Sequence, residues 1–127
     1  MNTVIKLNHI NLPVKDVAET SAFFEKYFDF KCIEIKGDHA LAVLKGVEDF
    51  VLVLMSEAFN KQNSIGYPDA FHIGFLVNDK EQVDHIFEKL SNGGVILERR
   101  PSNMRGVYGF YFNAPGNILI EVSSSKE

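Results

Sequence analysis

Two histidines and one glutamate, far apart in a chain of 127 residues, have the residue types of a mononuclear metal site. They are His9, His72 and Glu121. Two neutral imidazoles and one carboxylate suit a divalent Fe, Mn, Ni, Co or Zn ion and leave about three coordination positions open. Such an ion would hold two neighbouring substrate oxygens and stabilise the negative charge that develops on them. Taken singly, each histidine is more typical of a hydrogen-bonded structural residue, and the glutamate of a solvated strand edge.

The two histidines occupy equivalent positions of an internal repeat. The segment 9–16 resembles the segment 72–79 without a gap, and further on Phe-Glu-Lys at 24–26 corresponds to Phe-Glu-Lys at 87–89. A repeat of this length indicates two similar structural modules.

Each half shows the pattern of a strand, a helix and three further strands. Asp16 and Asp79 have the spacing of helix N-caps, and apolar residues follow both at helical intervals. Strands are expected at about 4–12, 30–36, 39–45 and 49–56, and again at about 70–77, 95–100, 106–113 and 117–123. We therefore predict an α+β fold in a single domain over 1–127, with module 1 at about 4–56, a linker at 57–69 and module 2 at about 70–123.

Alternation along the strands puts the three candidate ligands on the same side. The apolar set that alternates with them must pack on the helix of each module, so His9, His72 and Glu121 point away from the helices. If the modules assemble into one curved sheet, all three point into its hollow. Asn11 shares the face of His9 and is a candidate substrate contact.

Composition excludes several classes of partner. The formal charge is −4, from 13 basic and 17 acidic residues, which argues against nucleic acid. No apolar run approaches the ~20 residues of a membrane-spanning helix. A lone cysteine, Cys32, allows no internal disulfide, so we expect a cytoplasmic protein. We also expect its partner to be a small-molecule substrate.

Three motifs resemble the vicinal oxygen chelate superfamily, which includes glyoxalase I, extradiol dioxygenases, fosfomycin-resistance enzymes and bleomycin-resistance proteins. The motifs are Leu-Asn-His-Ile at 7–10, Phe-His-Ile-Gly-Phe at 71–75 and the segment 111–121. The resemblance implies a glyoxalase-like fold, in which paired β-α-β-β-β modules form a U-shaped mixed sheet around a central cavity. Its metal ligands would fall on His9, His72 and Glu121. Members this short usually form homodimers, often by pairing modules between chains.

The resemblance has two departures and one further candidate. Asn117 stands where the family commonly has glycine, and Val53 aligns with Glu121, where glyoxalase I-like members have a second carboxylate. Proton shuttling therefore lacks an obvious base. Tyr111, ten residues before Glu121, has a spacing similar to that of a tyrosine in extradiol dioxygenases, and we take it as the candidate catalytic residue. A strand aromatic that packs against a neighbour is the alternative.

Arg105 and Tyr108 are candidates for binding an anionic substrate group, with a solvated loop as the alternative. The sequence favours a metal-dependent glyoxalase- or dioxygenase-like enzyme acting on a small oxygen-rich metabolite or xenobiotic. Two alternatives stay open: a metal-free, bleomycin-resistance-like binding protein, and a fosfomycin-resistance-like enzyme that adds a thiol or water.

Overall fold

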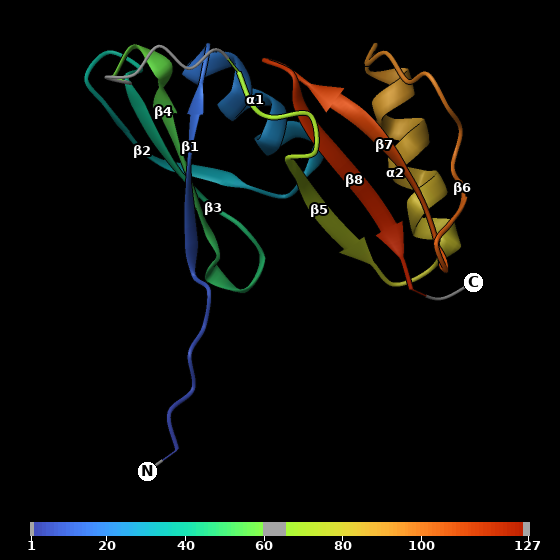
Figure 1. Cartoon of the computed structure of the whole chain (residues 1–127). Coiled ribbons are helices and arrows are strands. Elements are labelled where there is room, and N and C mark those ends of the chain that lie inside the picture. Colours follow the sequence, from blue (N-terminus) through green and yellow to red (C-terminus); the bar gives the residue numbers. More distant parts are fainter. Residues whose placement is uncertain (1, 60–65, 126–127) are drawn as a thin grey trace. The chain divides into compact units, whose positions relative to one another are not determined.

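The structure, a computed structural model, describes residues 2–59 and 66–125 (Figure 1). It divides the chain into two compact units, Met1–Ser64 and Ile65–Glu127. The division falls within the segment 57–69 that the sequence predicts as a linker.

The first unit is a four-stranded sheet with one helix. Its elements are β1 (His9–Val14), α1 (Val17–Tyr27), β2 (Lys31–Lys36), β3 (Leu41–Lys45) and β4 (Val51–Ser56), with short 3-10 turns at Val47–Asp49 and Glu57–Phe59. The strand order is β1-β4-β3-β2. β1 runs parallel to β4, and the other neighbours are antiparallel.

The second unit repeats this arrangement. Its elements are β5 (His72–Val77), α2 (Lys80–Asn92), β6 (Ser102–Met104), β7 (Val107–Ala114) and β8 (Ile118–Ser124), in the order β5-β8-β7-β6. Here too the first strand, β5, is parallel to the last, β8. The predicted α+β class with two β-α-β-β-β modules is confirmed.

Both helices begin where the sequence predicts. Asp16 accepts a hydrogen bond from the backbone N–H of Glu19, and Asp79 accepts one from Gln82, at 2.9 and 3.0 Å. Each bond satisfies an N–H that the first helical turn leaves without a partner. Asn117, which stands where the resemblance has a glycine, adopts a left-handed backbone with φ 61° in the turn before β8.

The strand predicted at 95–100 is wrong, because the short edge strand β6 forms only at Ser102–Met104. The N–H of Val95 donates to the carbonyl of Leu90 and closes the end of α2, while Ile96 is 83% exposed. Pro101 has no N–H to give to a ladder, so pairing with β7 starts after it. The first strand, expected from residue 4, begins at His9.

The core of each unit lies between its sheet and its helix. In the first unit the buried apolar strand residues are Leu12, Val14, Ala42, Leu44, Leu52 and Leu54, and they pack with residues such as Phe24 from α1. In the second unit they are Phe110, Phe112, Ala114, Ile118, Ile120 and Val122, with Val83, Phe87 and Leu90 from α2. The alternate residues point to the opposite side of each sheet, which we call its open face.

Candidate functional site

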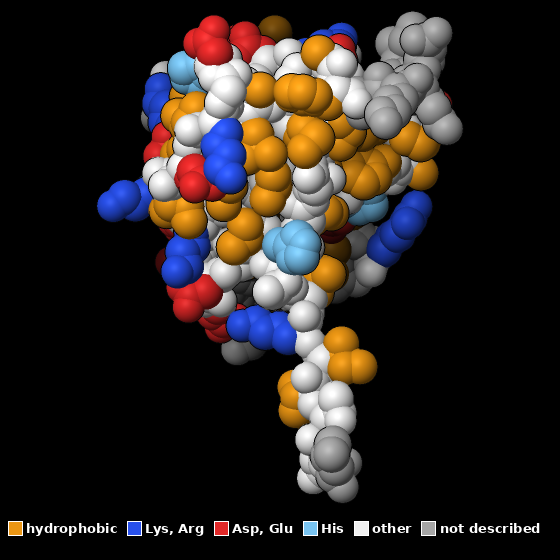
Figure 2. Space-filling model, turned by 90° about the vertical axis from the view of Figure 1, so that its left-hand side faces the viewer, with side chains coloured by type: hydrophobic (Ala, Val, Ile, Leu, Met, Phe, Trp, Pro, Cys, Tyr) orange, Lys and Arg blue, Asp and Glu red, His pale blue; other side chains and the backbone are white. Residues whose placement is uncertain are grey.

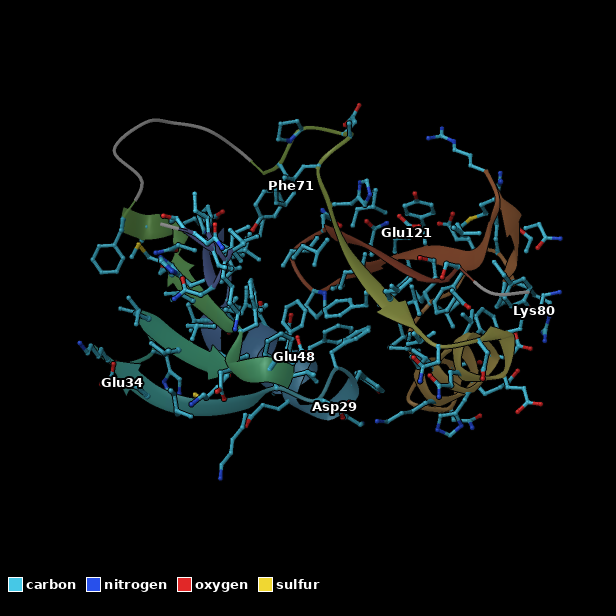
Figure 3. The ribbon with its side chains drawn as sticks, turned by 90° about the horizontal axis from the view of Figure 1, so that it is seen from below. Asp29, Glu34, Glu48, Phe71, Lys80 and Glu121 are labelled. Carbon is cyan, nitrogen blue, oxygen red and sulfur yellow. The ribbon has the colours of Figure 1, made fainter. Side chains whose placement is uncertain are left out.

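His72, Tyr111 and Glu121 form a cluster on the open face of the second unit. Glu121 lies on β8, between β5 and β7, and is paired with Gly74 on one side and Tyr111 on the other. Its Oε1 atom is 3.4 Å from Nε2 of His72 and accepts a 3.0 Å hydrogen bond from the Tyr111 hydroxyl. The His72 and Tyr111 rings meet edge to face at 5.5 Å. Figure 3 shows Glu121 on the side of the sheet away from α2.

The hydrogen-bond partner of His72 identifies which of its ring nitrogens carries a lone pair. Nδ1 lies 3.0 Å from the carbonyl oxygen of Ala70. A carbonyl only accepts, so Nδ1 carries the proton, and in the neutral imidazole Nε2 bears a lone pair. That lone pair faces a carboxylate oxygen of Glu121, which also carries only lone pairs. The approach is favourable only when a positive species, a proton or a metal cation, lies between the two atoms.

Tyr111 stays protonated at neutral pH. Burial, together with the hydrogen bond to the Glu121 carboxylate, raises the pKa of the Tyr111 hydroxyl above its ordinary value, while the positive charge of Arg105 acts in the opposite direction. Arg105 is therefore near enough for its charge to act on the cluster. It lies with Gly106 in the two-residue turn between β6 and β7, where both residues have positive φ.

The first unit carries the same framework with different side chains. Asn11 pairs with Val53, and Val53 pairs with Val43, in the register that Gly74, Glu121 and Tyr111 have in the second unit. Val53 thus takes the position of Glu121, as the sequence alignment predicts. Among the described residues, the open face of this unit has no carboxylate at that position.

His9 is oriented in the same way as His72. Its Nδ1 is 2.7 Å from the side-chain oxygen of Asn8, an acceptor, so Nδ1 donates and Nε2 is left with a lone pair. His9 lies on the exposed part of β1, opposite Val51. The structure brings His72 and Glu121 together within one unit and describes His9 and Asn11 within the other. Within residues 2–59 and 66–125 it assembles no group of three metal-binding side chains.

Tyr108 is not part of the cluster. It lies three residues before Tyr111 on the same strand and therefore points to the opposite face, toward α2. Its hydroxyl donates a 2.6 Å hydrogen bond to Asp84, and the ammonium of Lys80 lies 4.8 Å from its ring centre. The bond to Asp84 raises the pKa of Tyr108. Strand alternation could have separated Tyr108 from Arg105, although both were candidates for binding an anionic group.

The orienting groups of the two histidines were not predicted. The Ala70 carbonyl leaves no trace in residue type, because it is a backbone group. Asn8 precedes His9 directly and could have been considered as its partner. Neither helix of the described ranges is long and apolar enough to cross a membrane.

Known proteins resemble this chain over almost all of its length. Residues 6–122 match the family described as the Glyoxalase/Bleomycin resistance protein/Dioxygenase superfamily. The fosfomycin resistance protein FosX of Listeria innocua serovar 6a is 29% identical over 118 residues, which cover 91% of this chain and 86% of that protein. A possible glyoxalase from Bacillus cereus is 36% identical in its solved structure, with a TM-score of 0.81, covering 94% of this chain and 99% of that one.

A lactoylglutathione lyase from Agrobacterium tumefaciens is more distant in sequence. It is 18% identical with a TM-score of 0.76, covering 97% of this chain and 96% of that one, and so shares the fold. The family match, which includes both β-α-β-β-β modules, shows that the chain belongs to the Glyoxalase/Bleomycin resistance protein/Dioxygenase superfamily.

Proposed function

We propose that this protein is a divalent-metal-dependent enzyme that chelates and polarises a small molecule with two neighbouring oxygen atoms. Its metal ligands would be His9, His72 and Glu121. The observation that carries the proposal is the approach of His72 Nε2 to Glu121 Oε1, two atoms with lone pairs held 3.4 Å apart. A shared cation turns this approach from repulsive to favourable.

The donor atoms and their outer contacts fit such an ion. Two donors that are each about 2.1 Å from a common ion lie about 3.0 to 3.4 Å apart, depending on the coordination angle. Metal-binding histidines usually donate their other N–H to a carbonyl or carboxylate, as His72 does to Ala70. Glu121 is held in turn by the Tyr111 hydroxyl. When bound, the metal would supply Lewis acidity toward the substrate oxygens.

His9 is proposed as the third ligand for two reasons. It is the counterpart of His72 in the sequence repeat, and its Nδ1 contact with Asn8 leaves Nε2 with a lone pair. The ligand set is the same whether His9 acts beside His72 of its own chain or of a second copy.

The remaining residues of the proposal position the substrate. The protonated Tyr111 hydroxyl orients Glu121 and is the candidate proton donor, while Arg105 would attract an anionic group and Asn11 would hydrogen-bond on the side of His9. Val53 leaves the site without the second carboxylate that proton shuttling of the glyoxalase I type would use. Opening of a held epoxide, or reaction with oxygen, does not call for that carboxylate.

Metal titration of variants tests the ligand set. The protein is stripped with a chelator and titrated with Mn²⁺ by calorimetry. The His72→Ala, Glu121→Gln and His9→Ala variants are expected to bind Mn²⁺ at least about tenfold more weakly than the parent. His85→Ala, which removes a histidine from the exposed side of α2, is the matched control and is expected to leave affinity unchanged. Failure of the parent to bind one ion per site, or parent-like binding by His72→Ala, would refute the proposal.

A second candidate is fosfomycin resistance, favoured by the 29% identity to FosX over 91% of this chain. Attack of a nucleophile at an epoxide carbon breaks one C–O bond, and the released oxygen takes a proton. Phosphorus NMR of fosfomycin with Mn²⁺-loaded protein, with and without an added thiol, separates addition of water from addition of the thiol. An unchanged spectrum in both samples excludes this candidate. Tight fosfomycin binding that a chelator leaves unaffected would instead favour a metal-free binding protein.

A further inference from the structure

The open face of the first unit is apolar almost throughout. Strand alternation sends every second residue of β1, β3 and β4 to this side, and the apolar ones among them are half-buried. The residues concerned are Pro13, Leu41, Val43, Val51, Val53 and Met55, which we call the apolar face. Figure 2 shows hydrophobic side chains gathered next to one another on the side of the first unit that is in view.

The corresponding positions of the second unit are occupied by the hydrogen-bonding side chains of the cluster. By strand register, Val43 stands for Tyr111 and Val53 for Glu121. The histidine is kept in both units, as His9 and His72. The open face of one sheet thus has hydrogen-bonding groups, and that of the other has aliphatic groups, next to the same histidine position.

His9 is part of the sheet surface that carries the apolar face. It is the register partner of Val51, and Asn11, two residues further on the same side, is the partner of Val53. Paired strands run about 4.8 Å apart, so these valine side chains are the nearest neighbours of His9 and Asn11 across the ladder. A molecule held at an ion bound to His9 would therefore lie against Val51 and Val53.

From this placement we infer the substrate class. The substrate carries a small aliphatic or aromatic substituent next to its pair of oxygen atoms, and Val43, Val51 and Val53 bind that substituent. The inference rests on the proposed function, because it takes His9 as a metal ligand.

A series of hydroxamates tests the inference, since each presents two neighbouring oxygen atoms to a metal and differs only in its carbon chain. Acetohydroxamate, butyrohydroxamate and hexanohydroxamate are titrated into the full-length, Mn²⁺-saturated protein by calorimetry. Burial of a methylene contributes up to about fourfold in affinity, so we expect a gain of about two- to fourfold for each methylene added.

Threonine variants test whether the apolar face causes this gain in hydroxamate affinity. Val53→Thr, and the double variant Val43→Thr with Val53→Thr, keep side-chain shape and strand propensity while they add hydroxyls. Both are expected to bind Mn²⁺ as the parent does but to lose at least half of the chain-length gain. Val47→Thr, at an exposed valine in the 3-10 turn outside the apolar face, is expected to keep the whole gain.

The possible results are distinct. Binding of acetohydroxamate without a chain-length gain, or a gain that Val53→Thr leaves intact, overturns the inference while the metal site stands. Failure of the Mn²⁺-loaded parent to bind acetohydroxamate overturns the inference and the proposed function together. If the valine variants instead weaken self-association in sedimentation experiments and leave the hydroxamate series unchanged, a second copy of the chain covers the apolar face and the inference is wrong.

Discussion

Val53 and Glu121 occupy the same position in two copies of one sheet. Val53 lies between Asn11 and Val43 on its neighbouring strands, and Glu121 lies between Gly74 and Tyr111. The backbone framework that holds the carboxylate beside His72 in the second unit is therefore also present beside His9 in the first unit.

Val53→Glu should place a second carboxylate beside His9, so that the two side chains form a second pair of metal donors. The new carboxylate would have the register relative to His9 that Glu121 has relative to His72, so we expect Mn²⁺ affinity to rise by about tenfold with the added charge. Calorimetric titration measures the change. Val47→Glu adds the same charge in the 3-10 turn and is the control. Equal affinities of the two variants would show that position 53 does not face the ion.

Tyr111→Phe should weaken metal binding without unfolding the protein. It removes the hydroxyl that holds Glu121, and loss of such an outer contact costs about 10- to 100-fold in metal affinity. Tyr108→Phe is the matched control, because it too removes a tyrosine–carboxylate hydrogen bond from β7 but on the opposite face of the strand. Parallel Mn²⁺ titrations compare them. A similar loss in both variants would mean that the effect comes from β7 as a whole.

Tyr108 should make the stability of the protein depend on alkaline pH. Its pKa is raised in the folded state, chiefly by the bond to Asp84, so the stabilisation is fully present below the unfolded value of about 10 and is lost as pH rises through the folded value. The contribution is at most about 1 kcal/mol because the pair is exposed. Urea unfolding of the parent and Tyr108→Phe at pH 8 and pH 11 should show their difference in midpoint shrinking at the higher pH. A constant difference would contradict the assignment.

Gly109 and Gly106 should respond differently to alanine. A Cβ atom at Gly109 would overlap the carbonyl oxygen of Val122 on β8, and backbone atoms of a central strand cannot move aside, so we expect Gly109→Ala to lose about 3 kcal/mol or more. Gly106 has open space around it but a φ of +84°, so Gly106→Ala should cost about 1 kcal/mol of backbone strain. Urea unfolding measures both, and equal losses would contradict the overlap at Gly109.

Local features of the sequence determined much of the fold. The repeat of 9–16 at 72–79 predicts two equal modules, and Asp16 and Asp79 mark the starts of both helices, because an N-cap acts on N–H groups only a few residues away. Alternation with period two is also local, and it correctly places His72 and Glu121 on the open face. The same rule would have kept Tyr108 out of the site.

Only the tertiary structure decided what depends on pairing between distant segments. Residues 95–97 form an apolar run typical of a strand, but strand β6 forms at Ser102–Met104, because a strand exists only where a partner such as β7 shares its hydrogen bonds. The 3.4 Å approach of His72 to Glu121 depends on how strands far apart in sequence come together. Residue types alone identify possible donors, whereas the hydrogen-bond register between strands brings two of them within reach of one cation.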